Sequence, residues 1–248
     1  MLRNYRREVL LARRLTSEGI AVQRFHYRGA GHSDGDSRDV TFTSMVDDTL
    51  AAADRLSDVT GVKNVAFVGA RWGGLVAAAA ASTRGAPVAM WEPPVDRDRY
   101  FDEILRFRLM HELKRDPGSA VDSEQLLAQL NAAGSVDILG HNLERSLFES
   151  ARGVALSDIV RPNVPDALLV QVAVGRTLRR EYAAVVKAWK ERGVAVETTV
   201  VPDREAWWLS GDTWPIHETH APTAKLTETT SGWILRVSSE AGSSDVVA

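Results

Sequence analysis

The spacing of apolar positions changes from one segment of the chain to the next, and this alternation predicts an α/β protein. From residue 5 to residue 18 apolar side chains recur at helical spacing among arginines, and Gly19 stands where a helix would end. Short apolar runs separated by helical segments predict a mostly parallel sheet with helices on both faces. We expect strands at residues 20–27, 65–68, 88–91, 167–174 and 195–201. We expect helices at residues 5–18, 42–56, 75–82, 178–192 and 224–235.

The central part of the chain breaks this alternation. Residues 94–161 have a mostly helical pattern and no convincing buried strand, so we interpret them as a helical cap inserted into the sheet domain. The core is then expected at residues 1–93 and 162–237. Residues 238–248 are small and polar, which predicts a flexible tail.

Two glycine-rich turns carry a resemblance to a known superfamily. The run Phe25–Gly35, FHYRGAGHSDG, resembles the D-x-R-G-x-G-x-S-x-G loop that follows the fourth strand of α/β-hydrolases. Its distance from a second turn at Gly69–Gly74 also fits, because that turn corresponds to the G-x-S-x-G nucleophile elbow. The resemblance implies the α/β-hydrolase fold with an inserted cap.

Within that superfamily the chain is most similar to the hydrolase-like proteins associated with exosortase A systems. The similarity covers most of the chain and includes the arginine at the place of the nucleophile. The other features that carry it are Arg3–Arg14, Trp91-Glu92-Pro93, Tyr100–Leu113, Val136–Ser146 and Trp207-Trp208.

The elbow itself reads Gly69-Ala70-Arg71-Trp72-Gly73, so it has no serine. Gly69 and Gly73 keep the turn, and Gly74 allows close helix packing. A guanidinium has a pKa above about 12 and cannot attack a carbonyl at neutral pH, but at a helix N-terminus it can bind an anion. The alternative is that this arginine forms a structural salt bridge.

The other members of a Ser-His-Asp triad are missing as well. No aspartate lies at residues 175–177, directly after the expected strand at 167–174. No histidine lies at residues 203–207, after the expected strand at 195–201. Because the nucleophile, the base and the orienting acid are all missing from their expected places, we assign no catalytic residues and predict a non-catalytic protein. Two alternatives stay open: a hydrolase with relocated groups, such as Ser33 or Ser210 with His217 or His220, and a purely structural interaction subunit.

Several tryptophans fall near strand ends, where this fold opens its pocket. Together with the elbow arginine they would suit an amphipathic ligand with an anionic end. We therefore expect a small anionic or acyl ligand, or a protein partner, to bind at Arg71, Trp72, Trp91 and Trp208.

The α/β-hydrolase fold normally has three strands and an oxyanion loop before the helix that opens this sequence. Their absence would make residues 20–27 pair with the strand at 65–68 or leave a gap in the sheet. A start codon assigned too far downstream would explain it.

Composition excludes several other functions. The formal net charge of −3 offers no broad positive field for nucleic acid, and there is no cysteine for thiolate chemistry or sulfur-bound zinc. His217 and His220 have conceivable metal-ligand spacing but no third ligand motif, and Gly29-x-Gly31 lacks the rest of a dinucleotide fingerprint, so we expect no metal and no cofactor. No apolar run reaches the roughly 18 residues of a membrane span, and we expect a cytoplasmic protein.

Overall fold

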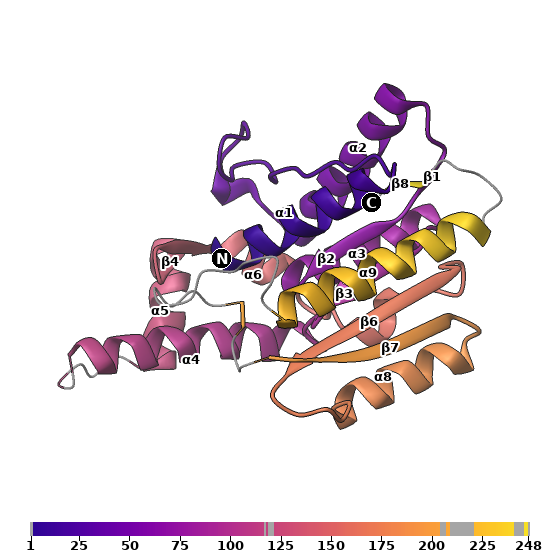
Figure 1. Cartoon of the computed structure of the whole chain (residues 1–248). Coiled ribbons are helices and arrows are strands. Elements are labelled where there is room, and N and C mark those ends of the chain that lie inside the picture. The colour runs from indigo at the N-terminus through magenta and orange to yellow at the C-terminus, as the bar shows by residue number, and fades with distance from the viewer. Residues whose placement is uncertain are drawn as a thin grey trace. The chain divides into compact units, whose positions relative to one another are not determined.

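Four parallel strands form the main sheet of the protein (Figure 1). A computed structural model describes residues 2–116, 118, 122–203, 207–208, 221–240 and 246–247. The strands pair in the order β2 (Phe67–Ala70), β3 (Val88–Trp91), β6 (Asp166–Ala173) and β7 (Ala195–Pro202). Because all four run in the same direction, their carboxyl ends meet at one edge of the sheet. The residues that follow each strand are therefore brought together.

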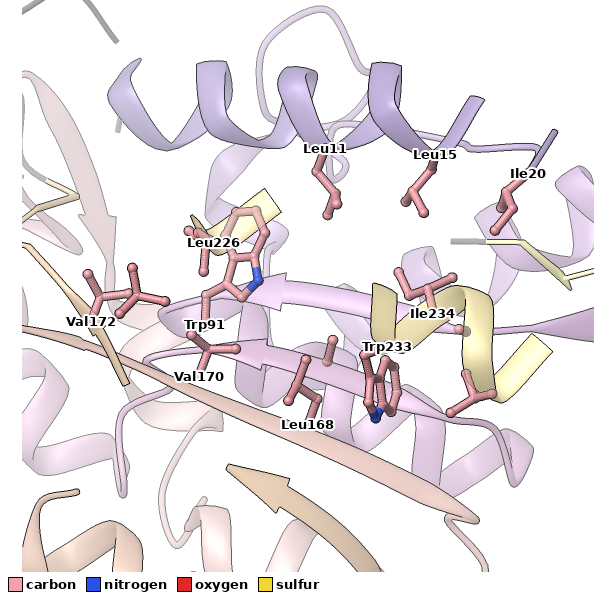
Figure 2. Packing of buried hydrophobic residues seen from close by; sticks show 14 of the residues in the cluster. Leu11, Leu15, Ile20, Trp91, Leu168, Val170, Val172, Leu226, Trp233 and Ile234 are labelled. Carbon is pink, nitrogen blue, oxygen red and sulfur yellow. The ribbon is translucent and has the colours of Figure 1, made fainter. Parts of the chain in front are cut away.

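One face of the sheet is covered by two helices from opposite ends of the sequence. These helices, α1 (Leu2–Ser17) and α9 (Ala221–Glu240), contact each other, and α9 also contacts β6 and β7. The apolar side of each helix meets alternate strand positions, as the period of two in a strand requires. The buried side chains of this face include Leu11, Leu15, Trp91, Leu168, Val170, Trp233 and Ile234 (Figure 2).

The intervening strand positions, such as Leu169, point to the opposite face of the sheet. Helices α3 (Trp72–Arg84) and α8 (Arg180–Glu191) follow β2 and β6 directly, and the short helix α7 (Leu156–Ile159) contacts both. Because most of the buried positions of α3 are glycine, alanine or serine, this helix lies close to β2 and β3. The expected α/β architecture is confirmed.

The chain divides into two compact units. The first contains the sheet and consists of Met1–Phe25, Thr49–Pro93 and Leu156–Ala248. The second consists of His26–Asp48 and Pro94–Ala155. The glycine-rich loop is thus grouped with the central segment of the chain. The action of residues 94–161 as a cap, and the flexibility of the tail, stay predictions.

The second unit is built mainly from helices. It contains η1 (Ser37–Asp39), α4 (Arg97–Arg115), α5 (Ser123–Ala133), β4 (Ser135–Ile138), β5 (His141–Glu144) and α6 (Arg145–Ser150). Hydrogen bonds from Ser37 to Glu144 and from Ser146 to the carbonyl of Val40 tie its two chain segments together. Arg97 packs over the rings of Phe101 and Phe148 and donates to the carbonyl of Phe148.

The remaining elements are short or span the boundary between the units. Helix α2 (Phe42–Thr60) crosses that boundary at Thr49. Strand β1 (Asn64–Val65) pairs in parallel with β8 (Val246–Val247). None of the helices in the described ranges combines the length and the apolarity needed to cross a membrane.

Two of the expected elements differ in the structure. Residues 20–27 form no strand, and among the described residues β2 has no strand partner on its outer side. The expected strand at residues 20–27 is therefore wrong. A strand needs a paired neighbour, which periodicity alone does not supply. The segment 94–161 also contains an antiparallel hairpin, β4–β5, whose turn holds Leu139 and Gly140 at positive φ. Strands of four residues are too short to stand out within a helical pattern.

Candidate functional site

The turn between β2 and α3 has a strained backbone with Arg71 at its apex. Arg71 has φ 52° and ψ −123°, a conformation that L-residues rarely adopt, and it is the N-cap of α3. A Cβ added at Gly69 would lie 2.1 Å from the carbonyl oxygen of Gly73, so residue 69 must be glycine. A Cβ at Gly74 would lie 3.0 Å from Pro93, whereas one at Gly73 would meet no described atom within 4 Å. Close approach therefore constrains Gly69 most.

The side chain of Arg71 is buried and turned toward the residue that follows β3. Its Nη1 donates to the carbonyl oxygen of Glu92 at 3.2 Å and lies 3.9 Å from the Oε2 atom of the same residue. Its guanidinium lies over the ring of Trp208, 5.0 Å from the centroid. A cation held in this way over an aromatic ring gains from the ring quadrupole as well as from the carboxylate.

Glu92 is the centre of the site, with only 5% of its side chain exposed. It directly follows β3 with φ 44°, and its N–H donates to the carbonyl oxygen of Val170 at 2.6 Å. Arg179 donates to Oε1, and the indole N–H of Trp207 donates to Oε2. Burial raises the pKa of Glu92 above its ordinary value, and the positive charges of Arg71 and Arg179 oppose that rise.

Arg179 lies at the N-cap of α8, in the loop that follows β6. Its side chain is 41% exposed, so it connects the buried carboxylate to solvent. The loop is fixed by the buried Gln171 of β6, whose Oε1 accepts from the N–H of Arg179 at 2.7 Å and whose Nε2 donates to the carbonyl of Thr177 at 3.0 Å. Tyr182 of α8 donates its hydroxyl to the carbonyl of Pro93 at 2.7 Å. Gln171 thus positions the arginine that reaches Glu92.

A second buried ion pair lies beside the first. Arg7 of α1 donates to Asp203, which follows β7, at 2.6 Å, and to Thr223 of α9 at 3.2 Å. Its guanidinium lies 4.8 Å from the ring centroid of Trp207. Trp207 therefore stacks on one arginine and donates its N–H to Glu92, so it joins the two ion-paired groups.

The structure distributes the expected ligand-binding residues over different environments. Arg71 and Trp208 are in contact, as described above. Trp72 is buried at the start of α3. Trp91 is almost fully buried in the core cluster, and its indole N–H donates to the hydroxyl of Thr230 at 2.9 Å. Trp91 therefore serves the core, and Arg71 and Trp208 are the two that the structure brings together.

Of the residues proposed for relocated catalysis, the structure describes only Ser33. Ser33 belongs to the second unit, where its hydroxyl donates to the carbonyl of His26. Ser210, His217 and His220 lie outside the described residues. Among the residues that the structure describes, no three His, Asp or Glu side chains form a group that could hold a metal ion.

Sequence reasoning missed the role of Glu92, Arg179, Gln171 and the Arg7–Asp203 pair. A signal for Glu92 was present, because a carboxylate directly after the wholly apolar strand Val88–Trp91 must lie at the carboxyl edge of the sheet. The polar Gln171 inside an apolar strand was a second signal, since buried amides need partners. Nothing in the sequence pairs Arg7 with Asp203, which are 196 positions apart.

Comparison with known proteins agrees with the fold. A family model described as serine aminopeptidase, S33, matches residues 3–91, which is less than half of the chain. The structure of Est1E from Butyrivibrio proteoclasticus with bound ferulic acid is 20% identical, with a TM-score of 0.61 over 93% of this chain and 82% of that one. The chain has the α/β-hydrolase fold. No curated protein matches its sequence.

A second solved structure supports the same fold. The esterase domain of a Rhodothermus marinus protein is 20% identical, with a TM-score of 0.53 over 93% of this chain and 80% of that domain. In the α/β-hydrolase fold the apex of the elbow holds the nucleophile, and the loops after later strands hold the acid and the histidine. In this chain Arg71 stands at the apex of the turn between β2 and α3, Arg179 follows β6, and Trp207 follows β7.

Proposed function

We propose that this chain is a non-catalytic α/β-hydrolase-fold protein whose elbow binds a small anionic or acyl ligand. The observation that carries the proposal is the elbow apex, where a buried arginine paired with Glu92 stands in place of a nucleophile. A guanidinium stays protonated at neutral pH, so it can stabilise negative charge but cannot form an acyl intermediate. The resemblance of the sequence to the hydrolase-like proteins associated with exosortase A systems supports the same assignment.

The contacts of the site favour an anion with an apolar part. Arg71 lies over Trp208 at the N-terminus of α3, and Arg179 lies over the ring of Tyr182 with its centroid at 5.9 Å. Two guanidinium groups close to one carboxylate attract a further negative group, and the indole ring offers apolar surface next to it. We assign direct contact to Arg71 and Trp208, with Trp72 and Trp91 shaping the site by packing.

A test of catalysis separates this proposal from a relocated hydrolase. A fluorophosphonate probe reacts with an activated serine hydroxyl, and we expect no labelling of the wild-type protein. We also expect Arg71→Ser to stay inactive on an activated ester, because the sequence has no acid at residues 175–177 and no histidine at residues 203–207, where the triad of this fold would place them. Turnover by that variant above the wild-type background would contradict the proposal.

A test of binding uses the charge of Arg71. Fatty acids, acyl phosphates and short dicarboxylates are screened by thermal shift against the wild type and Arg71→Met in parallel. If the arginine contacts the anion in a partly desolvated site, its loss should weaken binding by roughly 1.5 to 3 kcal/mol, about tenfold to a hundredfold in affinity. Equal responses of both proteins to every compound would reject ligand binding at the elbow.

A further inference from the structure

The side chain of Glu92 is held in the way in which a protein holds a bound carboxylate ligand. Each of its two oxygens has its own donor, with Arg179 on Oε1 and Trp207 on Oε2, and Arg71 lies 3.9 Å from Oε2. The two donors and Arg71 come from three separate segments, which follow β6, β7 and β2. Charged donors around a planar two-oxygen group make strong, directional hydrogen bonds.

The donors are held by contacts that do not involve the Glu92 side chain. Gln171 fixes the backbone of Arg179, Arg7 stacks on Trp207, and Trp208 stacks on Arg71. The arrangement of donors therefore does not depend on the carboxylate alone. A site whose donors are fixed in advance binds a ligand without the cost of ordering them.

The backbone of residue 92 is also held independently of its side chain. Its N–H is bonded to Val170, and the adjacent Pro93 carbonyl accepts from Tyr182. Its φ of 44° lies in the region that glycine adopts without strain. Glycine at this position should keep the local chain path while it removes the carboxylate.

We propose that Arg71, Arg179 and Trp207 form a carboxylate-binding site whose resident occupant is the side chain of Glu92. The site accepts a free monocarboxylate of matching length once that side chain is removed. This inference rests on the proposed function and makes it more specific. It names a carboxylate as the group by which an external ligand binds to Arg71, Arg179 and Trp207. A ligand carboxylate then competes with Glu92 for the partly exposed Arg179.

The test is chemical rescue of Glu92→Gly at pH 7.5. We expect the variant to melt roughly 6 to 15 °C below the wild type, because buried cationic groups lose their carboxylate. Sodium propionate replaces the atoms that are removed, and at 100 mM it should restore about 3 to 6 °C if it binds with a dissociation constant on the order of 10 mM. Acetate should restore less, and butyrate, which is one carbon too long, should also restore less.

Controls separate binding from general salt effects. Sodium chloride and phosphate at equal ionic strength should restore much less than propionate, and Glu92→Gln, whose side chain still fills the site, should not respond. The double variant with Arg179→Gln should lose most of the rescue. Equal rescue by propionate and chloride, or full rescue without Arg179, would overturn the proposal.

The experiment gives a decision even if Glu92→Gly is recovered unfolded. Refolding yield is then measured in propionate and in chloride, and a higher yield of folded protein in propionate supports the site. Equal yields overturn it. The rescue result is independent of the ligand screen. A wild type that binds none of the screened compounds would reject the proposed function, whereas the carboxylate-binding site is judged by the rescue of Glu92→Gly alone.

Discussion

Two buried arginines of the sheet unit occupy similar surroundings but are bonded differently. Arg7 and Arg71 each pair with an acidic residue that follows a strand, and each lies over one of two adjacent tryptophans, Trp207 and Trp208. The Arg7–Asp203 pair has a short contact of 2.6 Å, and both side chains are less than a tenth exposed. The carboxylate of Glu92, by contrast, accepts from Arg179 and Trp207 and lies near the charge of Arg71, and Arg179 reaches solvent.

The Arg7–Asp203 pair is closed to solvent, whereas the Glu92 carboxylate could exchange one of its partners for a ligand through the partly exposed Arg179. A closed buried pair holds α1 and α9 on the strand end, and removal of either charge leaves the other in a medium of low dielectric constant. The Glu92 carboxylate has two hydrogen-bond donors and a nearby cation, so it keeps at least one hydrogen bond when any one of these three groups is lost. We therefore expect mutations in the two groups to have unequal effects on stability.

The largest effect is expected from Arg7→Met. Removal of the cation from buried Asp203 should lower the free energy of unfolding by about 3 to 5 kcal/mol, as measured by urea denaturation. Arg7→Lys is the matched control, because it keeps the charge and should lose less. A change below about 1 kcal/mol would mean that the pair is not the closed contact described here.

A smaller loss is expected from Arg71→Met. Glu92 keeps Arg179 and Trp207 as donors in this variant, so the free energy of unfolding should fall by only about 1 to 3 kcal/mol. Urea denaturation in the same buffer gives the comparison. A loss equal to that of Arg7→Met would show that both arginines serve stability alone.

Gln171→Leu should have a still smaller effect on stability, about 1 to 2 kcal/mol. The substitution keeps the volume but removes the hydrogen bonds to the N–H of Arg179 and the carbonyl of Thr177, which lie in a loop that water can reach. Hydrogen exchange of the Arg179 amide should speed up selectively. Unchanged exchange there would contradict a positioning role for Gln171.

The smallest expected effect is a dependence on pH. Because burial raises the pKa of Glu92 in the folded state, folding favours the protonated form of this side chain. Its contribution to the free energy of unfolding is therefore lost as pH rises from the ordinary pKa of glutamate through the raised pKa of the folded state. The wild type should therefore lose more stability over this interval than Glu92→Gln, which does not titrate. Parallel unfolding curves at pH 4.5 and pH 7 measure the difference, and the opposite sign would show that the arginines outweigh burial.

Local patterns in the sequence predicted most of the fold. The helical spacing before Gly19 and the apolar runs before Gly69 and Glu92 lie where the structure has α1, β2 and β3. These elements are specified by neighbours in the chain. The segment at residues 20–27 has the sequence pattern of a strand, but pairing depends on a partner elsewhere, and the described sheet provides none.

The site was less predictable than the fold. The glycines and Arg71 form a local motif, so the elbow and its unusual apex could be found in the sequence. Glu92 and Arg179 are separated by 87 positions, and only the parallel order of β3 and β6 brings them together. Long-range ion pairs of this kind follow from topology, which the sequence pattern constrains but does not determine.

The close approach at Gly69 has a consequence for how such chains are recognised. With a Cβ at residue 69 only 2.1 Å from the Gly73 carbonyl oxygen, the first glycine is demanded by the crossing of strand and helix, whatever side chain stands at the apex. A protein that has lost catalytic activity would still need that glycine in order to fold. The first glycine of an elbow motif therefore indicates the fold, and only the residue at the apex indicates whether the protein has a nucleophile.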